Sequence, residues 1–96
     1  MKEVAVNEVP AGAQLIDVRE TDEYAEVRAQ GAVNIPMSEF VGRINEIDLD
    51  RDIYVICKLG GRSAQVAEYL EQRGIEAINV NGGTDGWVAA GLPTEA

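Results

Sequence analysis

The sequence predicts an α/β fold, in which a mainly parallel central sheet of four to five strands has helices on both faces. Two observations lead to this prediction. Short, apolar, β-branched runs alternate along the chain with polar segments of helical spacing, a pattern typical of parallel sheets whose strands are connected by helices. The length of 96 residues suits one packed core. We therefore expect residues 1–96 to form a single domain with one active centre at most.

The predicted strands are the apolar runs of the sequence. Gln14–Val18 and Ile53–Ile56 are short, apolar and β-branched, as expected of strands that are covered on both faces. Glu3–Val6 alternates enough to be a short first strand, and Ile75–Val80 is the last. Ala32–Pro36 should be extended as well, because the residue before a proline avoids the α region.

The connecting segments are predicted to be helical. Thr21 is a candidate N-cap for a first helix, and Ser38 is one for a second helix with apolar residues at helical spacing. The clearest helix runs from Arg62 to Arg73 and has an apolar stripe. Thr84–Ala90 is expected to form a final helical turn or two.

The charge of the chain excludes several classes of partner. Seventeen acidic residues stand against eight basic ones, so the net charge is −9. Such a charge repels nucleic acid phosphates and anionic membrane surfaces, and no apolar run approaches the roughly 18 residues that a membrane span needs. Acidic side chains within Met1–Glu8 stand where a signal peptide needs an apolar segment. We expect a cytoplasmic protein that binds neither nucleic acid nor membrane.

The chain contains one cysteine and no histidine. One cysteine cannot form an intrachain disulfide, and without histidine neither Ser-His-Asp or Cys-His catalysis nor a usual zinc site is available. No metal or organic cofactor is therefore expected. Backbone dipoles or cationic side chains must activate the cysteine.

The cysteine, Cys57, lies where a predicted strand passes into a helix. Gly60 and Gly61 let the loop turn its N–H groups inward, and the helix start adds partial positive charge. Such a cradle stabilises an anion, for which the thiolate of Cys57 is the nearest candidate. Lys58 and Arg62 add two cations beside it. The alternative interpretations are an inert buried thiol, an ordinary tight turn and a solvated arginine.

Other polar residues also follow the ends of predicted strands. Asp17, Cys57 and Asn81–Gly83 all occupy such positions, and ligands of parallel sheets bind beyond the carboxyl ends of the strands. Asp17 is expected to hydrogen-bond loop N–H groups, to pair with an arginine, or to cap the following helix. Arg19 either orients this edge or is solvated. Trp87 is expected in the core.

Four segments of the sequence resemble the signature segments of the rhodanese domain, in the right order and over nearly the whole chain. They are Leu15–Glu20, Gly31–Pro36, Cys57–Ser63, and Asn81–Gly83 followed by Gly86-Trp87 and Gly91–Pro93. The resemblance implies a single-domain rhodanese, whose loop cysteine takes a sulfane sulfur from a donor such as thiosulfate. The cysteine becomes a persulfide and passes the sulfur to cyanide, a thiol or a partner protein in a sulfur relay.

The resemblance also assigns residues to this chemistry. It implies that Cys57 bears the persulfide and that the loop cradling it consists of Lys58, Leu59, Gly60, Gly61, Arg62 and Ser63. Arg28 stands where many family members have a histidine, a change that bears on packing and surface charge. Lys58 and Leu59 lie at variable positions, so the identity of the donor stays open.

Two other functions remain as alternatives. Phosphatases and arsenate reductases use a similar loop of the form Cys-x5-Arg, but here only the residues 58–61 separate Cys57 from Arg62. The shorter loop suits a sulfane sulfur better than a tetrahedral phosphate. Rhodanese-like domains also occur as non-catalytic binding modules or partner-specific sulfur carriers, because fold does not settle function. The non-catalytic forms often lose the cysteine, which this chain keeps.

Overall fold

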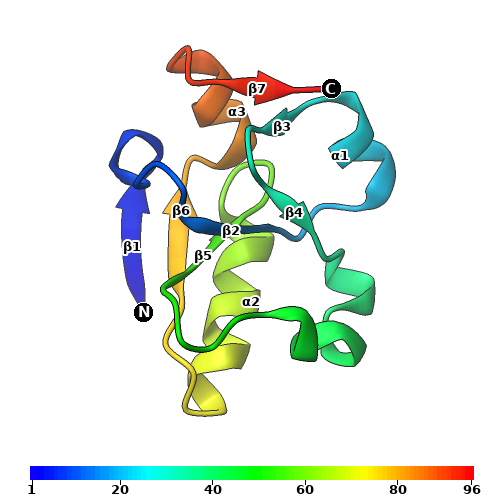
Figure 1. The fold of residues 1–96 in the computed structure, drawn as a ribbon, viewed down its shortest axis with the longest axis vertical. Coiled ribbons are helices and arrows are strands. Elements are labelled where there is room, and N and C mark those ends of the chain that lie inside the picture. The colour runs from blue at the N-terminus through cyan, green and yellow to red at the C-terminus, as the bar shows by residue number, and fades with distance from the viewer.

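The computed structural model describes all residues, 1–96, and is built around a five-stranded sheet in which every paired strand is parallel. The strand order is β1-β6-β5-β2-β4 (Figure 1). The strands are β1 (Lys2–Ala5), β2 (Gln14–Asp17), β4 (Val33–Asn34), β5 (Ile53–Ile56) and β6 (Ile78–Asn81). The predicted fold class is therefore confirmed.

The central strand β5 explains why the sheet needs cover on both faces. All four of its residues are buried, and its side chains alternate between two separate hydrophobic clusters. Ile53 and Val55 belong to the cluster that contains Leu70. Tyr54 and Ile56 belong to the cluster that contains Trp87.

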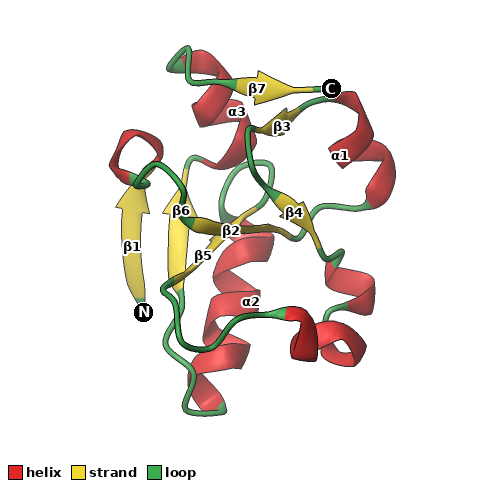
Figure 2. Cartoon of the chain, in the orientation of Figure 1, coloured by secondary structure: helices red, strands yellow, loops and turns green.

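Helices cover both faces of the sheet, as Figure 2 shows. One cluster is closed by α2 (Gly61–Gln72) and by the 3₁₀ helices η2 (Met37–Glu39) and η3 (Val41–Glu46). The other is closed by α1 (Thr21–Glu26) and α3 (Gly83–Ala89). The remaining elements are the 3₁₀ helix η1 (Val6–Glu8) and an antiparallel pair of β3 (Arg28–Ala29) and β7 (Thr94–Glu95).

Several boundaries differ from the sequence-based expectations. The helix expected after Ser38 is a pair of 3₁₀ helices, with hydrogen bonds such as that from the Arg43 N–H to the Phe40 carbonyl. Gly42 lies inside this segment, where glycine disfavours a regular α-helix. The last strand starts at Ile78 rather than at Ile75, because the Ile75 N–H bonds back to α2.

The first helix, which the sequence predicts to stop before Gly31, is shorter in the structure. It ends at Glu26 because Val27 is extended, with φ −159°, and the chain then enters β3. Its N-cap is Glu20, and Thr21 is the first helical residue. No helix of the structure is both long and apolar enough to cross a membrane.

Candidate active site

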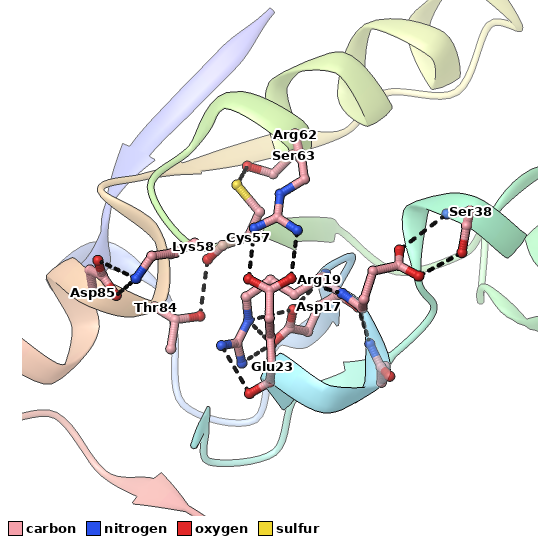
Figure 3. A network of polar contacts seen from close by, with 12 residues as sticks. Asp17, Arg19, Glu23, Ser38, Cys57, Lys58, Arg62, Ser63, Thr84 and Asp85 are labelled. Atoms are coloured by element: carbon pink, nitrogen blue, oxygen red, sulfur yellow. Dashed lines mark hydrogen bonds and ion pairs between the residues drawn. The ribbon is translucent and has the colours of Figure 1, made fainter. Parts of the chain in front are cut away.

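The candidate site lies at the carboxyl ends of three neighbouring strands. β2 and β5 are in register, with Asp17 opposite Ile56, and β6 ends at Asn81 on the other side of β5. Cys57 follows directly after β5 and precedes α2. The fold therefore brings the residues expected at one edge of the sheet together, as Figure 3 shows for Asp17 and Cys57.

The Cys57 side chain is buried, with 1% of its surface exposed, and its sulfur accepts hydrogen bonds from the loop. The Gly60 N–H donates to Sγ over 3.0 Å, and the Ser63 hydroxyl lies 3.2 Å from Sγ. Gly60 has φ +121°, a conformation that residues with a Cβ rarely adopt. This conformation turns the Gly60 N–H towards the sulfur.

The loop shifts the ionisation of the thiol. Burial raises the pKa of Cys57, but hydrogen bonds from the Ser63 hydroxyl and from the amides of Ser63, Gly60 and Leu59 favour the thiolate. The pKa of Cys57 is thereby lowered from its ordinary value of 9.0. The Leu59 side chain itself points to solvent and is 65% exposed. The chain thus supports its thiolate with the Ser63 hydroxyl and, each to a smaller extent, with peptide amides of the loop.

The two cations of the loop each bind a carboxylate. Arg62 donates to Glu23 of α1 through two hydrogen bonds of 2.7 and 2.9 Å, and Lys58 forms an exposed ion pair with Asp85 of α3 at 3.1 Å (Figure 3). We expected both cations to face the anion. Instead, the carboxylates of neighbouring helices compete for them, and sequence reasoning had not found these partners.

The pairing of Arg62 changes two pKa values. The hydrogen bond from Arg62 lowers the pKa of Glu23 from 4.5 to about 2. The pKa of Arg62 is raised in turn, chiefly by Glu23 and to a smaller extent by the charge of Cys57. The charge of Cys57 thus acts on Arg62 while Arg62 is bound to Glu23 of α1.

Asp17 and Arg19 form a buried ion pair with each other. The Arg19 guanidinium donates to Asp17 over 2.8 to 3.1 Å, and the Arg19 N–H donates to the same carboxylate. The guanidinium also donates to the main-chain carbonyls of Glu23 and Val27. Of the expected roles for Asp17, pairing with an arginine is the one found. The pair anchors α1, which holds Glu23 against Arg62.

The start of α3 is hydrogen-bonded to the main chain of the cysteine loop. The Thr84 N–H and hydroxyl both donate to the Cys57 carbonyl, over 2.7 and 3.0 Å. Gly83 has φ +60°, and a Cβ there would lie 2.6 Å from the same carbonyl oxygen. The glycine pair of the Asn81–Gly83 segment was noticed in the sequence, but the role of Thr84 was not.

A chain of polar contacts leads from the sulfur through the buried Ser63 and Asn79 to the exposed Glu3. The Ser63 hydroxyl bonds to Oδ1 of Asn79 in β6, and Asn79 Nδ2 donates to the Glu3 carboxylate over 3.0 Å and to the Gly60 carbonyl over 3.3 Å. Glu3 and Asn79 are paired across β1 and β6. Sequence reasoning missed both residues. A polar residue between the apolar Ile78 and Val80 was the available signal, because a buried amide needs partners.

No group of three or more His, Cys, Asp and Glu side chains with the arrangement of a metal site occurs in the structure.

Comparison with solved structures supports the description of the fold. The protein SSP1007 from Staphylococcus saprophyticus is 38% identical, with a TM-score of 0.86 over 97% of this chain and 99% of that protein. A rhodanese-related protein from Thermoplasma volcanium is 28% identical, with a TM-score of 0.92 over 99% of this chain and 98% of that protein.

Sequence comparison identifies the family. A model of the rhodanese-like domain matches residues 3–90. A protein named sulfurtransferase from Allochromatium vinosum is 37% identical over 83 residues, which are 85% of this chain and 78% of that protein. Thiosulfate sulfurtransferase GlpE of Actinobacillus pleuropneumoniae is 34% identical over 85 residues, or 88% of this chain and 79% of that protein. The chain belongs to the rhodanese-like domain family, which confirms the resemblance seen in its four segments.

Proposed function

We propose that this protein is a rhodanese-type sulfurtransferase in which Cys57 carries the transferred sulfur as a persulfide. The observation that supports this most is the position of the Cys57 sulfur, which accepts the Gly60 N–H at 3.0 Å inside a loop that lowers its pKa. The names of two relatives, a sulfurtransferase and a thiosulfate sulfurtransferase, agree with this chemistry.

The reaction takes place in two displacement steps. In the first, the Cys57 thiolate attacks the outer sulfur of a donor such as thiosulfate. A new S–S bond forms, the donor's own S–S bond breaks, and sulfite leaves with the electron pair of that bond. In the second, a nucleophile such as cyanide attacks the outer sulfur of the persulfide, and the thiolate is released with the product thiocyanate.

The loop from Lys58 to Ser63 suits both steps. The thiolate and the persulfide are anions, and inward-facing amides stabilise an anion without any rearrangement at the moment of reaction. Only residues 58–61 separate Cys57 from Arg62, which leaves a narrow cradle. This width favours a sulfur atom over the phosphate of a phosphatase.

Mass spectrometry of the intact protein tests the proposal. After incubation with thiosulfate and removal of the donor, we expect the mass to rise by one sulfur atom and to return to its starting value after addition of cyanide. Cys57→Ser is the control and should gain nothing, although its far-ultraviolet circular dichroism should match that of the unchanged protein. Equal thiocyanate formation by Cys57→Ser would refute the assignment.

One observation favours a second candidate, a sulfur carrier that is loaded by a partner protein. Lys58 and Arg62 are each already bound to a carboxylate, so little unpaired positive charge faces a small dianion. A persulfide on a partner protein carries less negative charge than a dianion such as thiosulfate, so its binding requires less unpaired positive charge at the site. Loading by a protein persulfide but not by thiosulfate would select this candidate. Aryl phosphate hydrolysis that depends on Cys57 would instead support a phosphatase.

A further inference from the structure

The Ser63 hydroxyl has one hydrogen and two neighbours that can accept it. One is the Cys57 sulfur at 3.2 Å and the other is Oδ1 of Asn79. A hydroxyl can donate only one hydrogen bond, although it accepts two. The hydroxyl therefore stabilises the thiolate only when its hydrogen turns towards the sulfur. When the hydrogen points to Asn79, the Ser63 oxygen can instead accept the S–H of the neutral thiol.

The orientation of the Asn79 amide decides between these two arrangements. Its Nδ2 donates to two acceptors, the Glu3 carboxylate and the Gly60 carbonyl, neither of which can donate in return. If the amide turned over, its oxygen would face both of these oxygens. The amide is therefore held with Oδ1 towards Ser63, where it competes with the sulfur for the hydroxyl hydrogen.

We propose that Glu3 is a positioning residue for the reactive cysteine, which acts through Asn79 and the Ser63 hydroxyl to set how readily Cys57 ionises. Asn79 and Ser63 are almost completely buried, at 1% and 0% exposure. Bulk water therefore does not compete for their hydrogen bonds. Glu3 lies at an exposed position of β1. The inference rests on the proposed role of Cys57 as the reacting sulfur.

The contact between the Ser63 hydroxyl and Asn79 affects the unloaded cysteine and its persulfide differently. A hydroxyl that is turned towards Asn79 opposes a negative charge on Sγ. It does not oppose a persulfide, whose charge is on the outer sulfur and whose inner sulfur is neutral. Glu3 thus keeps the unloaded cysteine closer to the thiol and leaves the loaded form unaffected.

The variant Glu3→Gln tests this. A glutamine amide can both donate and accept, so only the Gly60 carbonyl still favours the present orientation of Asn79. The preference is therefore weaker, and the Ser63 hydrogen turns towards the sulfur more often. We expect the pKa of Cys57 to fall by about half a unit, which raises the thiolate fraction about threefold below the midpoint. The ultraviolet absorbance of the thiolate reports this pKa, because Cys57 is the only cysteine.

A double-mutant cycle separates this mechanism from simple loss of charge. If Glu3 acts through the hydroxyl, Glu3→Gln should not change the pKa of Cys57 in a Ser63→Ala background. An equal shift in both backgrounds, or no shift in either, would overturn the proposal. Glu76→Gln removes the same charge at another exposed position and should have no effect on the pKa.

The other charged groups around the sulfur stay constant in this comparison. They are the pairs Arg62–Glu23, Asp17–Arg19 and Lys58–Asp85 (Figure 3). The titration requires no sulfur transfer. A shift that disappears in the Ser63→Ala background, together with a failure to load sulfur, would therefore support this inference and refute the proposed function separately.

Discussion

Gly60 shapes the site through a backbone conformation that suits only glycine. Its φ of +121° directs its N–H to the sulfur, and its carbonyl accepts from Asn79 and from the Ala64 N–H. The next glycine, Gly61, is the first residue of α2 and has no positive φ. Of the two glycines in the loop, the first is therefore the one that the geometry requires.

Gly83 provides a prediction at the same scale. Gly83→Ala should lower the free energy of unfolding by about 2 kcal/mol more than Gly82→Ala, because its Cβ would overlap the backbone of the cysteine loop. Both glycines have a positive φ, but a Cβ at Gly82 would meet nothing closer than 3.8 Å. Urea unfolding of the two variants measures the difference, and equal losses would contradict the close contact.

The functional roles of some residues could be predicted from the sequence, and those of others could not. Cys57 and its glycine loop could be identified because they interrupt a regular strand-to-helix pattern. The partners of the loop cations could not, since Glu23 and Asp85 look like ordinary acidic residues in the first turn of a helix. Their pairing depends on how three helices pack, which local spacing does not encode.

At the scale of elements, α1 depends on its contacts with the rest of the molecule. It has only six residues, too few for a helix to be stable by itself. Arg19 donates to the Glu23 carbonyl within α1 and to the Val27 carbonyl just after it, and the Glu23–Arg62 pair joins α1 to α2. Its early end at Glu26 was not predictable, because the extended Val27 is fixed by the pairing of β3 with the distant β7.

The Glu23–Arg62 contact predicts how stability changes with pH. The pKa of Glu23 is lowered to about 2 in the folded protein, so its contribution is complete above the ordinary value of 4.5 and is lost as the pH falls towards 2. Glu23→Gln should therefore be less stable than the unchanged protein at neutral pH, and this difference should shrink on acidification.

Urea unfolding at several pH values measures this difference. Glu68→Gln, at an exposed position on α2, is the control and should differ little from the unchanged protein throughout. A stability difference for Glu23→Gln that does not vary between neutral and acid pH would mean that the pair contributes nothing.

At the scale of the whole molecule, parallel topology is what assembles the site. The chain leaves the carboxyl edge of the sheet after β2, β5 and β6, and the segments after these strands supply the residues around the sulfur. This convergence was predictable from alternating strands and helices. The β3–β7 pair was not, because it joins segments that lie far apart in the sequence. The 3₁₀ form of η2 and η3 had one local signal, Gly42.

The pKa of Cys57 tests the central claim that the fold turns loop amides onto a reactive sulfur. Ultraviolet titration of the folded protein, with Cys57→Ser subtracted to remove the signal of the three tyrosines, should show the thiolate forming at lower pH than in the urea-unfolded chain. A folded-state pKa equal to or above that of the unfolded chain would contradict the account.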